Sequence, residues 1–419
     1  MPRLPLDIVE TVIDILTQED DSNFSFIKSC ALVCHDFLPI SRKRIFASLA
    51  INDSYACPSQ PYAYIHRMTP SRFRELLTTS PEIADYIRDL NYRVREKDLG
   101  EDALIASLKS MTRLQSLMIW NAVTVPISWN WSTSRIRTAF VHLFRLPTFN
   151  ELSLYGIRYF IIADLPPNLK NFTFDDLHVL PAPPPSSQIN IYAMSIGRCG
   201  YTCDTASEQF YEARIENGKP VIDLTSLNSL ESELYGQDSV KTLQDLLGHC
   251  TGLAHVKIQS IGSPLKLGSS ADSILTPVID ESLSLAGLNR VHKMLSPSLK
   301  TLKHLQIKAV FNYDDPYCGI ADELELMSGR NVIEIINIQI TIRMDAEGTD
   351  EDEWGRLDSI RTQPAWPHLR SLILSIIVNS HAREDELAES LKAMAATQFK
   401  GITSRETVSF KFNVSEDWL

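Results

Sequence analysis

Leu302-Lys303-His304-Leu305-Gln306-Ile307-Lys308 follows the pattern apolar-x-x-apolar-x-apolar. Because successive side chains of a strand point to opposite faces, this spacing places Leu305 and Ile307 on one face and polar side chains on the other. A pattern that recurs along a chain predicts one structural unit used many times. The same hexad begins at Ile87, Leu114, Phe149, Leu169, Leu253 and Leu369, with weaker copies near 191–196, 227–234, 332–338 and 408–412.

Segments with helical spacing of apolar residues separate several of these copies. Within residues 239–250, for example, Val240, Leu243 and Leu247 recur three or four positions apart. Further helices are expected at 72–77, 101–111, 286–295 and 385–397. Alternation of strand and helix resembles a leucine-rich-repeat solenoid. The predicted fold class is therefore α/β, an irregular solenoid of short parallel strands alternating with helices, with an ordinary open α/β sheet as the alternative.

The spacing between copies is irregular, with 20 residues from Phe149 to Leu169 but 35 from Leu114 to Phe149. We favour the solenoid because the same hexad recurs, whereas doubly wound sheets carry continuous apolar strands. Three segments interrupt the pattern. Trp129-Asn130-Trp131 begins a long insertion, the proline-rich residues 181–187 are expected to be extended and to join two stretches of repeat, and residues 348–353 form an acidic loop.

The first fifty residues contain three short apolar segments, at 4–16, 30–37 and 45–49, which we expect to be helices. Pro5 suits the first helical position, where its missing N–H costs nothing. Two sets of apolar residues in the first segment recur at helical spacing, namely Ile8, Val12 and Ile15, and Val9, Ile13 and Leu16. Helices this short cannot bury so wide an apolar stripe on one another alone. A partner surface is therefore expected.

This segment resembles an F-box, the helical module by which substrate receptors bind the Skp-type adaptor of cullin–RING ubiquitin ligases. The resemblance covers residues 3–50 and lies in Leu4-Pro5, Val12-Ile13, Leu16 and Leu32-Val33-Cys34 followed by Phe37. The whole chain resembles the F-box-like proteins of mushroom-forming fungi. Most F-boxes carry tryptophan in place of Phe37 and a Leu-Trp pair in place of Ile45-Phe46, but both changes keep an apolar aromatic. The alternative is an N-terminal helical cap on the rest of the fold.

The resemblance implies the substrate-recognition subunit of an SCF-type cullin–RING E3 ubiquitin ligase, which performs no bond chemistry itself. Residues 1–50 would bind the Skp-type adaptor and, through it, the cullin scaffold. Residues 51–85 would form a helical linker or cap, and residues 86–419, interrupted near 181–187, the repeats that hold a protein substrate. The expected adaptor contacts are Leu4, Pro5, Ile8, Val12, Leu32, Val33, Cys34, Phe37 and Phe46.

In such a solenoid the positions between the apolar residues of each hexad, and just after them, face the concave side of the sheet. Early copies place acids and aromatics there, and later copies place basic and amide side chains. This mixture suits a polar protein or peptide ligand, with Trp120 and Tyr155 as the best anchors. The expected substrate-binding residues are Met118, Trp120, Glu151, Tyr155, Asp175, His255, Lys257, His304, Gln306 and Lys308.

The composition is that of a globular chain, with 419 residues, 44% hydrophobic, 22% charged and a net charge of −12. That negative charge disfavours binding to nucleic acid or to an anionic membrane. The sequence has no run of eighteen apolar residues, so no transmembrane helix is expected, and acids near the N-terminus argue against a signal peptide. Seven scattered cysteines predict reduced thiols, and hence a cytoplasmic or nuclear protein.

The sequence lacks the common catalytic motifs, namely Gly-x-Ser-x-Gly, His-Glu-x-x-His, Gly-x-Gly-x-x-Gly and a phosphate-binding glycine loop. Cys30 and Cys34 share a helical face, but His35 points about 100° away. The pair Cys199 and Cys203 lacks a second ligand pair for zinc. We therefore expect no catalytic residue, metal or cofactor. Two alternatives stay open: a binding scaffold with a vestigial F-box outside any ligase, and a hydrolase using a serine and one of the ten histidines.

Overall fold

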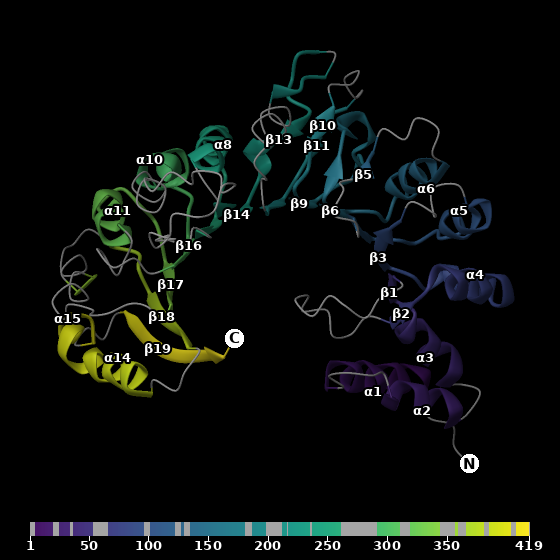
Figure 1. Cartoon of the computed structure of the whole chain (residues 1–419), viewed down its shortest axis with the longest axis horizontal. Helices are drawn as coiled ribbons and strands as arrows, with labels where there is room; N and C mark the ends of the chain where they lie inside the picture. The colour runs from purple at the N-terminus through teal and green to yellow at the C-terminus, as the bar shows by residue number, and fades with distance from the viewer. Residues whose placement is uncertain are drawn as a thin grey trace, which may run out of the picture. The chain divides into compact units, whose positions relative to one another are not determined.

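The protein is described from a computed structural model (Figure 1). The structure describes residues 5–19, 25–33, 37–52, 66–95, 101–121, 127–129, 135–180, 187–197, 212–215, 217–234, 237–260, 291–310, 319–343, 357–358, 366–380, 385–403 and 408–418. Two compact units are present. Unit 1 comprises Met1–Ile189 and Glu212–Val221, and unit 2 comprises Asn190–Tyr211 and Ile222–Leu419. The segments 181–186 and 348–353, Cys199 and Cys203 lie outside the described residues.

Three short helices open the chain: α1 (Leu6–Glu19), α2 (Ser25–Val33) and α3 (Phe37–Ile45). The backbone N–H groups of Ile8 and Val9 donate to the Pro5 carbonyl, which places the proline at the helix start. Val9 and Ile13 of α1 form a small core with Ile40 of α3. Helix α1 therefore lies where the sequence predicts it and packs on α3. Helix α2 begins before the predicted segment 30–37 and is described only to Val33, and Phe37 of that segment belongs to α3.

The third helix, which Pro39 is expected to start, is present as α3, but it ends earlier than the sequence predicts. The expected helix at 45–49 is replaced by the end of α3 at Ile45 and by strand β1 (Ser48–Ile51). Leu49 and Ile51 are almost fully buried, and β1 pairs in parallel with both β2 (His66–Met68) and β3 (Asp89–Val94). Tertiary pairing therefore overrides the local helical tendency. The sheet accordingly begins at Ser48 and not at residue 86, and the expected linker 51–85 contains one of its strands.

Six parallel strands form the main sheet of unit 1. In spatial order they are β2, β1, β3, β4 (Ser116–Asn121), β6 (Glu151–Tyr155) and β9 (Asn171–Asp175). Helices α4 (Pro70–Thr79), α5 (Asp102–Lys109) and α6 (Arg135–Phe144) lie on one face of this sheet (Figure 1). The shorter elements are η1 (Pro81–Asp85), β5 (Ile127–Ser128), β7 (Ile157–Arg158), β8 (Phe160–Ile161), η3 (Ile162–Asp164), β10 (Val179–Leu180) and β11 (Ile189–Asn190).

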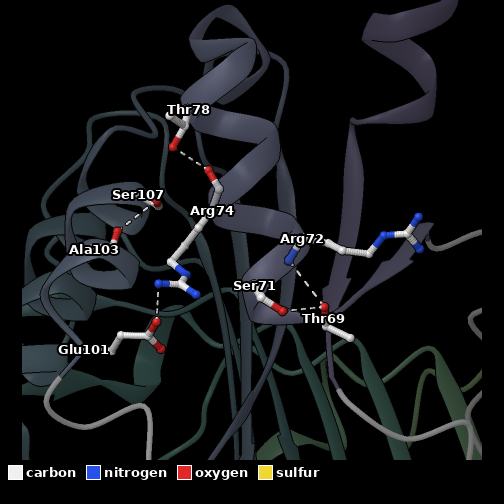
Figure 2. Close-up of polar contacts among 8 residues, drawn as sticks. All are labelled: Thr69, Ser71, Arg72, Arg74, Thr78, Glu101, Ala103 and Ser107. Atoms are coloured by element: carbon white, nitrogen blue, oxygen red, sulfur yellow. Dashed lines mark hydrogen bonds and ion pairs between the residues drawn. The ribbon is translucent and has the colours of Figure 1, made fainter.

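Polar contacts fix the start of α4 and join it to α5, as Figure 2 shows. The Thr69 side-chain oxygen accepts a hydrogen bond from the Arg72 backbone N–H at 3.3 Å, and Pro70 occupies the first helical position. One turn further on, the Arg74 guanidinium lies 2.5 Å from the carboxylate of Glu101, the residue just before α5. Consecutive helices on this face are thus connected by side chains as well as by the strand between them.

Trp129, the residue at which the predicted insertion begins, belongs to the core of unit 1. The Trp129 ring is fully buried and stacks on Phe140 and Phe144 of α6, with ring centroids 6.1 Å from each. Its indole N–H donates to the Asp164 carboxylate at 2.8 Å. Helix α6, which the sequence analysis did not predict, is therefore held against the rest of unit 1 by an aromatic cluster.

Seven parallel strands form the sheet of unit 2, with neighbours in chain order. They are β12 (Ala193–Ile196), β14 (Ser229–Leu234), β15 (His255–Ser260), β16 (His304–Val310), β17 (Ile335–Arg343), β18 (Ser371–Ser380) and β19 (Ser409–Trp418). The helices again lie on one face (Figure 1). The remaining elements are β13 (Ile222–Asp223), η4 (Leu224–Ser226), α8 (Gln237–Gly248), α10 (Val291–Leu295), η5 (Ser296–Ser298), α11 (Ile320–Met327), α14 (Asp385–Gln398) and α15 (Lys400–Thr403).

Each copy of the hexad coincides with a strand, and the five expected helices are present as α4, α5, α8, α10 and α14. Burial alternates as the pattern predicts on several strands, whereas three consecutive residues are buried on β4 and on β6. On β16, for example, Leu305 and Ile307 are buried while His304, Gln306 and Lys308 stay partly exposed. The α/β class with short parallel strands is thus confirmed. The core of each unit lies between the sheet and its helices, and the other sheet face carries the polar side chains.

Candidate binding surfaces

Helices α1 and α2 carry an unusual concentration of exposed apolar side chains. Of the nine large apolar side chains exposed among the described residues, six lie on these two helices, and they are between 45% and 87% exposed. Scattered exposed apolar residues are common, whereas a cluster of this kind marks an interaction site. We call this set the helical apolar surface; it consists of Ile8, Val12, Ile15, Phe26, Leu32 and Val33.

Most described residues of the predicted adaptor set are exposed. Pro5 and four members of the helical apolar surface fall in this class. The two aromatics differ, because each is only partly exposed and contacts the chain itself. Phe37 packs on the core of Val9, Ile13 and Ile40, and the Phe46 ring meets the His66 ring edge-on at 5.7 Å. Leu4 and Cys34 lie outside the described residues.

The predicted set of adaptor contacts did not include two members of the helical apolar surface. Ile15 shares the helical spacing of Ile8 and Val12, so the pattern already contained it. Phe26 lies on α2, one turn before Cys30. The apolar spacing could have found both residues, because it marks the whole stripe and not only the positions that match a known motif.

Four side chains form a row in register on the sheet face of unit 1 that no described helix covers. Arg93, Trp120, Tyr155 and Asp175 occupy equivalent positions on β3, β4, β6 and β9. The Arg93 guanidinium carbon lies 4.9 Å from the centroid of the Trp120 ring, and the Trp120 indole N–H donates to the Asn91 side chain at 2.6 Å. Trp120 is thus held by a cation–π contact and a hydrogen bond. Arg93 and Asn91 were not predicted.

Met118 is the least exposed of the predicted substrate-binding residues. Its side chain is only 8% exposed, because it lies in the middle row of the sheet face between two neighbours that are also buried, Asn91 and Ser153. An apolar side chain in that position packs down among its neighbours and leaves little surface for a ligand. Glu151, Tyr155 and Asp175, in contrast, are partly exposed.

The uncovered face of unit 2 brings five predicted residues together on two adjacent strands. His255 lies opposite His304, and Lys257 lies opposite Gln306. The two imidazole rings meet edge-to-face with centroids 4.4 Å apart, and the Lys257 ammonium pairs with the Glu231 carboxylate. We call this set the central patch; it consists of His255, Lys257, His304, Gln306 and Lys308.

The electrostatics of the central patch favour loss of positive charge. Burial lowers the pKa of Lys308, and the nearby Lys257 lowers it further, against the opposing attraction of Glu231 and Glu233. Burial also lowers the pKa of His304, with a second contribution from His255. Burial is thus the main reason that both side chains hold a proton less strongly than they would in water.

Among the described residues, no group of three or more His, Cys, Asp or Glu side chains is placed to hold a metal ion. No helix in the described part of the chain is both long and apolar enough to cross a membrane. Neither known protein-family models nor curated proteins match this sequence. Any functional conclusion therefore has to be drawn from the two kinds of surface described above.

Cys250 provides a test of the packing between α8 and the sheet of unit 2. Burial raises the pKa of its thiol from 9.0 to about 12. Because the thiolate is the reactive form, a rise of this size suppresses alkylation at pH 8 about a thousandfold. We expect iodoacetamide to modify Cys250 rapidly in urea but hardly at all in the native chain, as peptide mass spectrometry would measure. The partly exposed Cys30 is the internal control, and equal native rates at both sites would contradict the expectation.

Proposed function

We propose that this protein is the substrate-recognition subunit of an SCF-type cullin–RING E3 ubiquitin ligase. The observation that carries the proposal is the helical apolar surface. Six large apolar side chains on α1 and α2 remain exposed while Val9, Ile13 and Ile27 of the same helices are buried. The helices thus have an inner apolar side that the chain fills and an outer one that a second protein can fill.

A partner that covers the helical apolar surface would gain free energy from the burial of its side chains. Burial of one large apolar side chain contributes about 1.5–3 kcal/mol, so a partner that covers several of them gains enough to offset the cost of association. Interfaces of this kind are found where short helices present an apolar stripe to a groove. We propose a Skp-type adaptor as this partner because residues 3–50 resemble an F-box.

We further propose that the two units are leucine-rich-repeat-like and hold the substrate. In each unit parallel strands pair in register, and the helices cover one face of the sheet. Parallel sheets of doubly wound proteins have helices on both faces. An arrangement with one uncovered, polar face suits a solenoid that binds a protein, and favours it over the open sheet kept as an alternative.

The proposed role is to bring a substrate lysine close to a ubiquitin-loaded enzyme that the rest of the complex supplies. A receptor that binds the adaptor at one end and the substrate at another raises the effective concentration of the reacting groups. The protein needs two binding surfaces for this role and no catalytic group. Its two candidate surfaces, on α1 and α2 and on the uncovered sheet faces, meet that requirement.

Co-expression with a fungal Skp-type adaptor tests the proposal. We expect affinity capture of the full chain to retain the adaptor through size-exclusion chromatography, and addition of the cullin to give a three-component complex. Capture of a folded chain without the adaptor would contradict the proposal and favour the scaffold that acts outside a ligase. Far-UV circular dichroism of the captured chain establishes that it is folded.

A further inference from the structure

The uncovered face of the unit 2 sheet has a cationic zone directly beside an acidic one. Strands β15 and β16 present two histidines and two lysines, and the neighbouring β14 presents two glutamates. The strand pairing places these groups in adjacent columns, so their charges act on the same ligand. The cationic zone consists of Lys257 and Lys308, with His255 and His304 beside them, and the acidic zone consists of Glu231 and Glu233.

The two lysines are diagonal neighbours, and only one of them has a counter-ion. Lys257 lies opposite Gln306, and Lys308 lies opposite Gln259. One strand spacing and two residues along the strand separate their Cα atoms by about 8 Å, so both ammonium groups can reach a single anion. Lys257 pairs with Glu231, whereas Lys308 makes no ion pair with another residue in the described part of the chain.

The environment of Lys308 leaves its charge incompletely compensated. Burial is the largest influence on its pKa and lowers it, and Lys257 lowers it further. Glu231 and Glu233 raise the pKa again but do not restore its ordinary value. An anion bound between the two lysines would stabilise the charged form of Lys308 and remove this deficit.

Amide side chains surround the cationic zone and are available for hydrogen bonding. In register, Gln306 lies opposite Asn337 and Lys308 lies opposite Gln339. Within the described residues, the side chains of Gln259, Gln306, Asn337 and Gln339 make no hydrogen bond to one another or to a neighbour. Each amide supplies both a donor and an acceptor, which is what the backbone of an extended polypeptide requires.

We propose that β15, β16 and β17 bind an extended polypeptide segment that carries an anionic side chain, a carboxylate or a phosphate. The amide side chains contact its backbone, and Lys308 and Lys257 hold the anion. Glu231 and Glu233 repel acidic residues, so a neutral or basic residue of the segment lies over β14. This inference rests on the proposed function, because it names the class of substrate that the receptor holds.

The test uses the full chain and three fluorescent heptapeptides of alanine and serine whose central residue is phosphoserine, glutamate or glutamine. Because a hydrogen bond to a charged group contributes about 1.5–3 kcal/mol, we expect an anionic peptide to bind at least about tenfold more tightly than the glutamine peptide in fluorescence polarisation. Preference for phosphoserine alone identifies a phosphate, and equal preference for glutamate shows that a carboxylate suffices. Equal affinity for all three, or no binding, overturns the proposal.

Variants locate the binding site. Lys308→Met should abolish the preference for the anionic peptides, and Lys308→Arg should keep it. Lys411→Met is the matched control, because Lys411 is an exposed lysine on β19 of the same sheet. Unchanged preference in Lys308→Met, or equal loss in Lys411→Met, would contradict the assignment. If the chain captures the adaptor but shows no peptide preference, this inference fails and the proposed function stands.

Discussion

Replacement of both Val12 and Leu32 by lysine is expected to raise the Kd for the proposed partner, a Skp-type adaptor, at least about a hundredfold. Each side chain belongs to the helical apolar surface, and loss of their burial removes about 3 kcal/mol or more from the interface. Lysine suits the positions, because it has higher helix propensity than valine and because Leu32 lies in the last turn of α2, where a cation favours the helix dipole. Isothermal titration calorimetry with purified adaptor measures the change.

A matched control is Leu326→Lys, which replaces an equally apolar side chain that is 56% exposed on α11 in unit 2. It should leave the adaptor affinity unchanged, and both variants should keep the circular dichroism of the parent chain. An unchanged Kd in the double variant would show that α1 and α2 do not form the adaptor surface. Loss of affinity in Leu326→Lys would show that exposed apolar groups anywhere in the chain contribute non-specifically.

The strands could be predicted because the hexad contains two independent signals, the alternation of apolar residues and its repetition. Strands β1 and β2 were not predicted, because they are short and their apolar and polar residues do not alternate. Leu49, Ala50 and Ile51 are apolar in succession, and such a run reads equally well as helix or strand. Only pairing with β3, which depends on residues forty positions away, decides between them.

Helix α6 shows a signal that was present but overlooked. Ile136, Phe140 and Leu143 follow helical spacing, and all three are buried. The arginines on either side of Ile136 and the apparent insertion at Trp129 made this spacing less evident. The aromatic cluster itself could not be predicted, because the contact of Trp129 with Phe140 depends on how α6 packs in three dimensions.

The sequence predicts which sheet face each candidate residue lies on, but it does not predict which residues contact one another. The hexad rule places Arg93 and Trp120 on the same face, yet their contact depends on the register between β3 and β4. Register across parallel strands is set by the intervening helix and loops, which the hexad does not describe. The same limit explains Met118, whose burial depends on its neighbours on adjacent strands.

Alanine at Trp129 is expected to destabilise unit 1 by about 3–5 kcal/mol, the usual cost of removing a fully buried large aromatic. The ring stacks on two phenylalanines of α6, and its loss leaves a cavity lined by rigid aromatic side chains that cannot collapse into it. Hydrogen exchange with mass spectrometry reports the change locally. Peptides from α6 should lose protection, while those from β16 and β17 in unit 2 should serve as the internal reference.

The Trp120→Ala variant separates this packing effect from the general loss of a tryptophan. Trp120 is partly exposed, and its removal costs a cation–π contact and one hydrogen bond, together about 2 kcal/mol. Asp164 pairs with Arg137 at 2.8 Å, and we expect the Trp129→Ala variant to keep this ion pair, so that no uncompensated charge confounds the comparison. If Trp129→Ala proved no more destabilising than Trp120→Ala, the Trp129 cluster could not be the packing centre that holds α6 in unit 1.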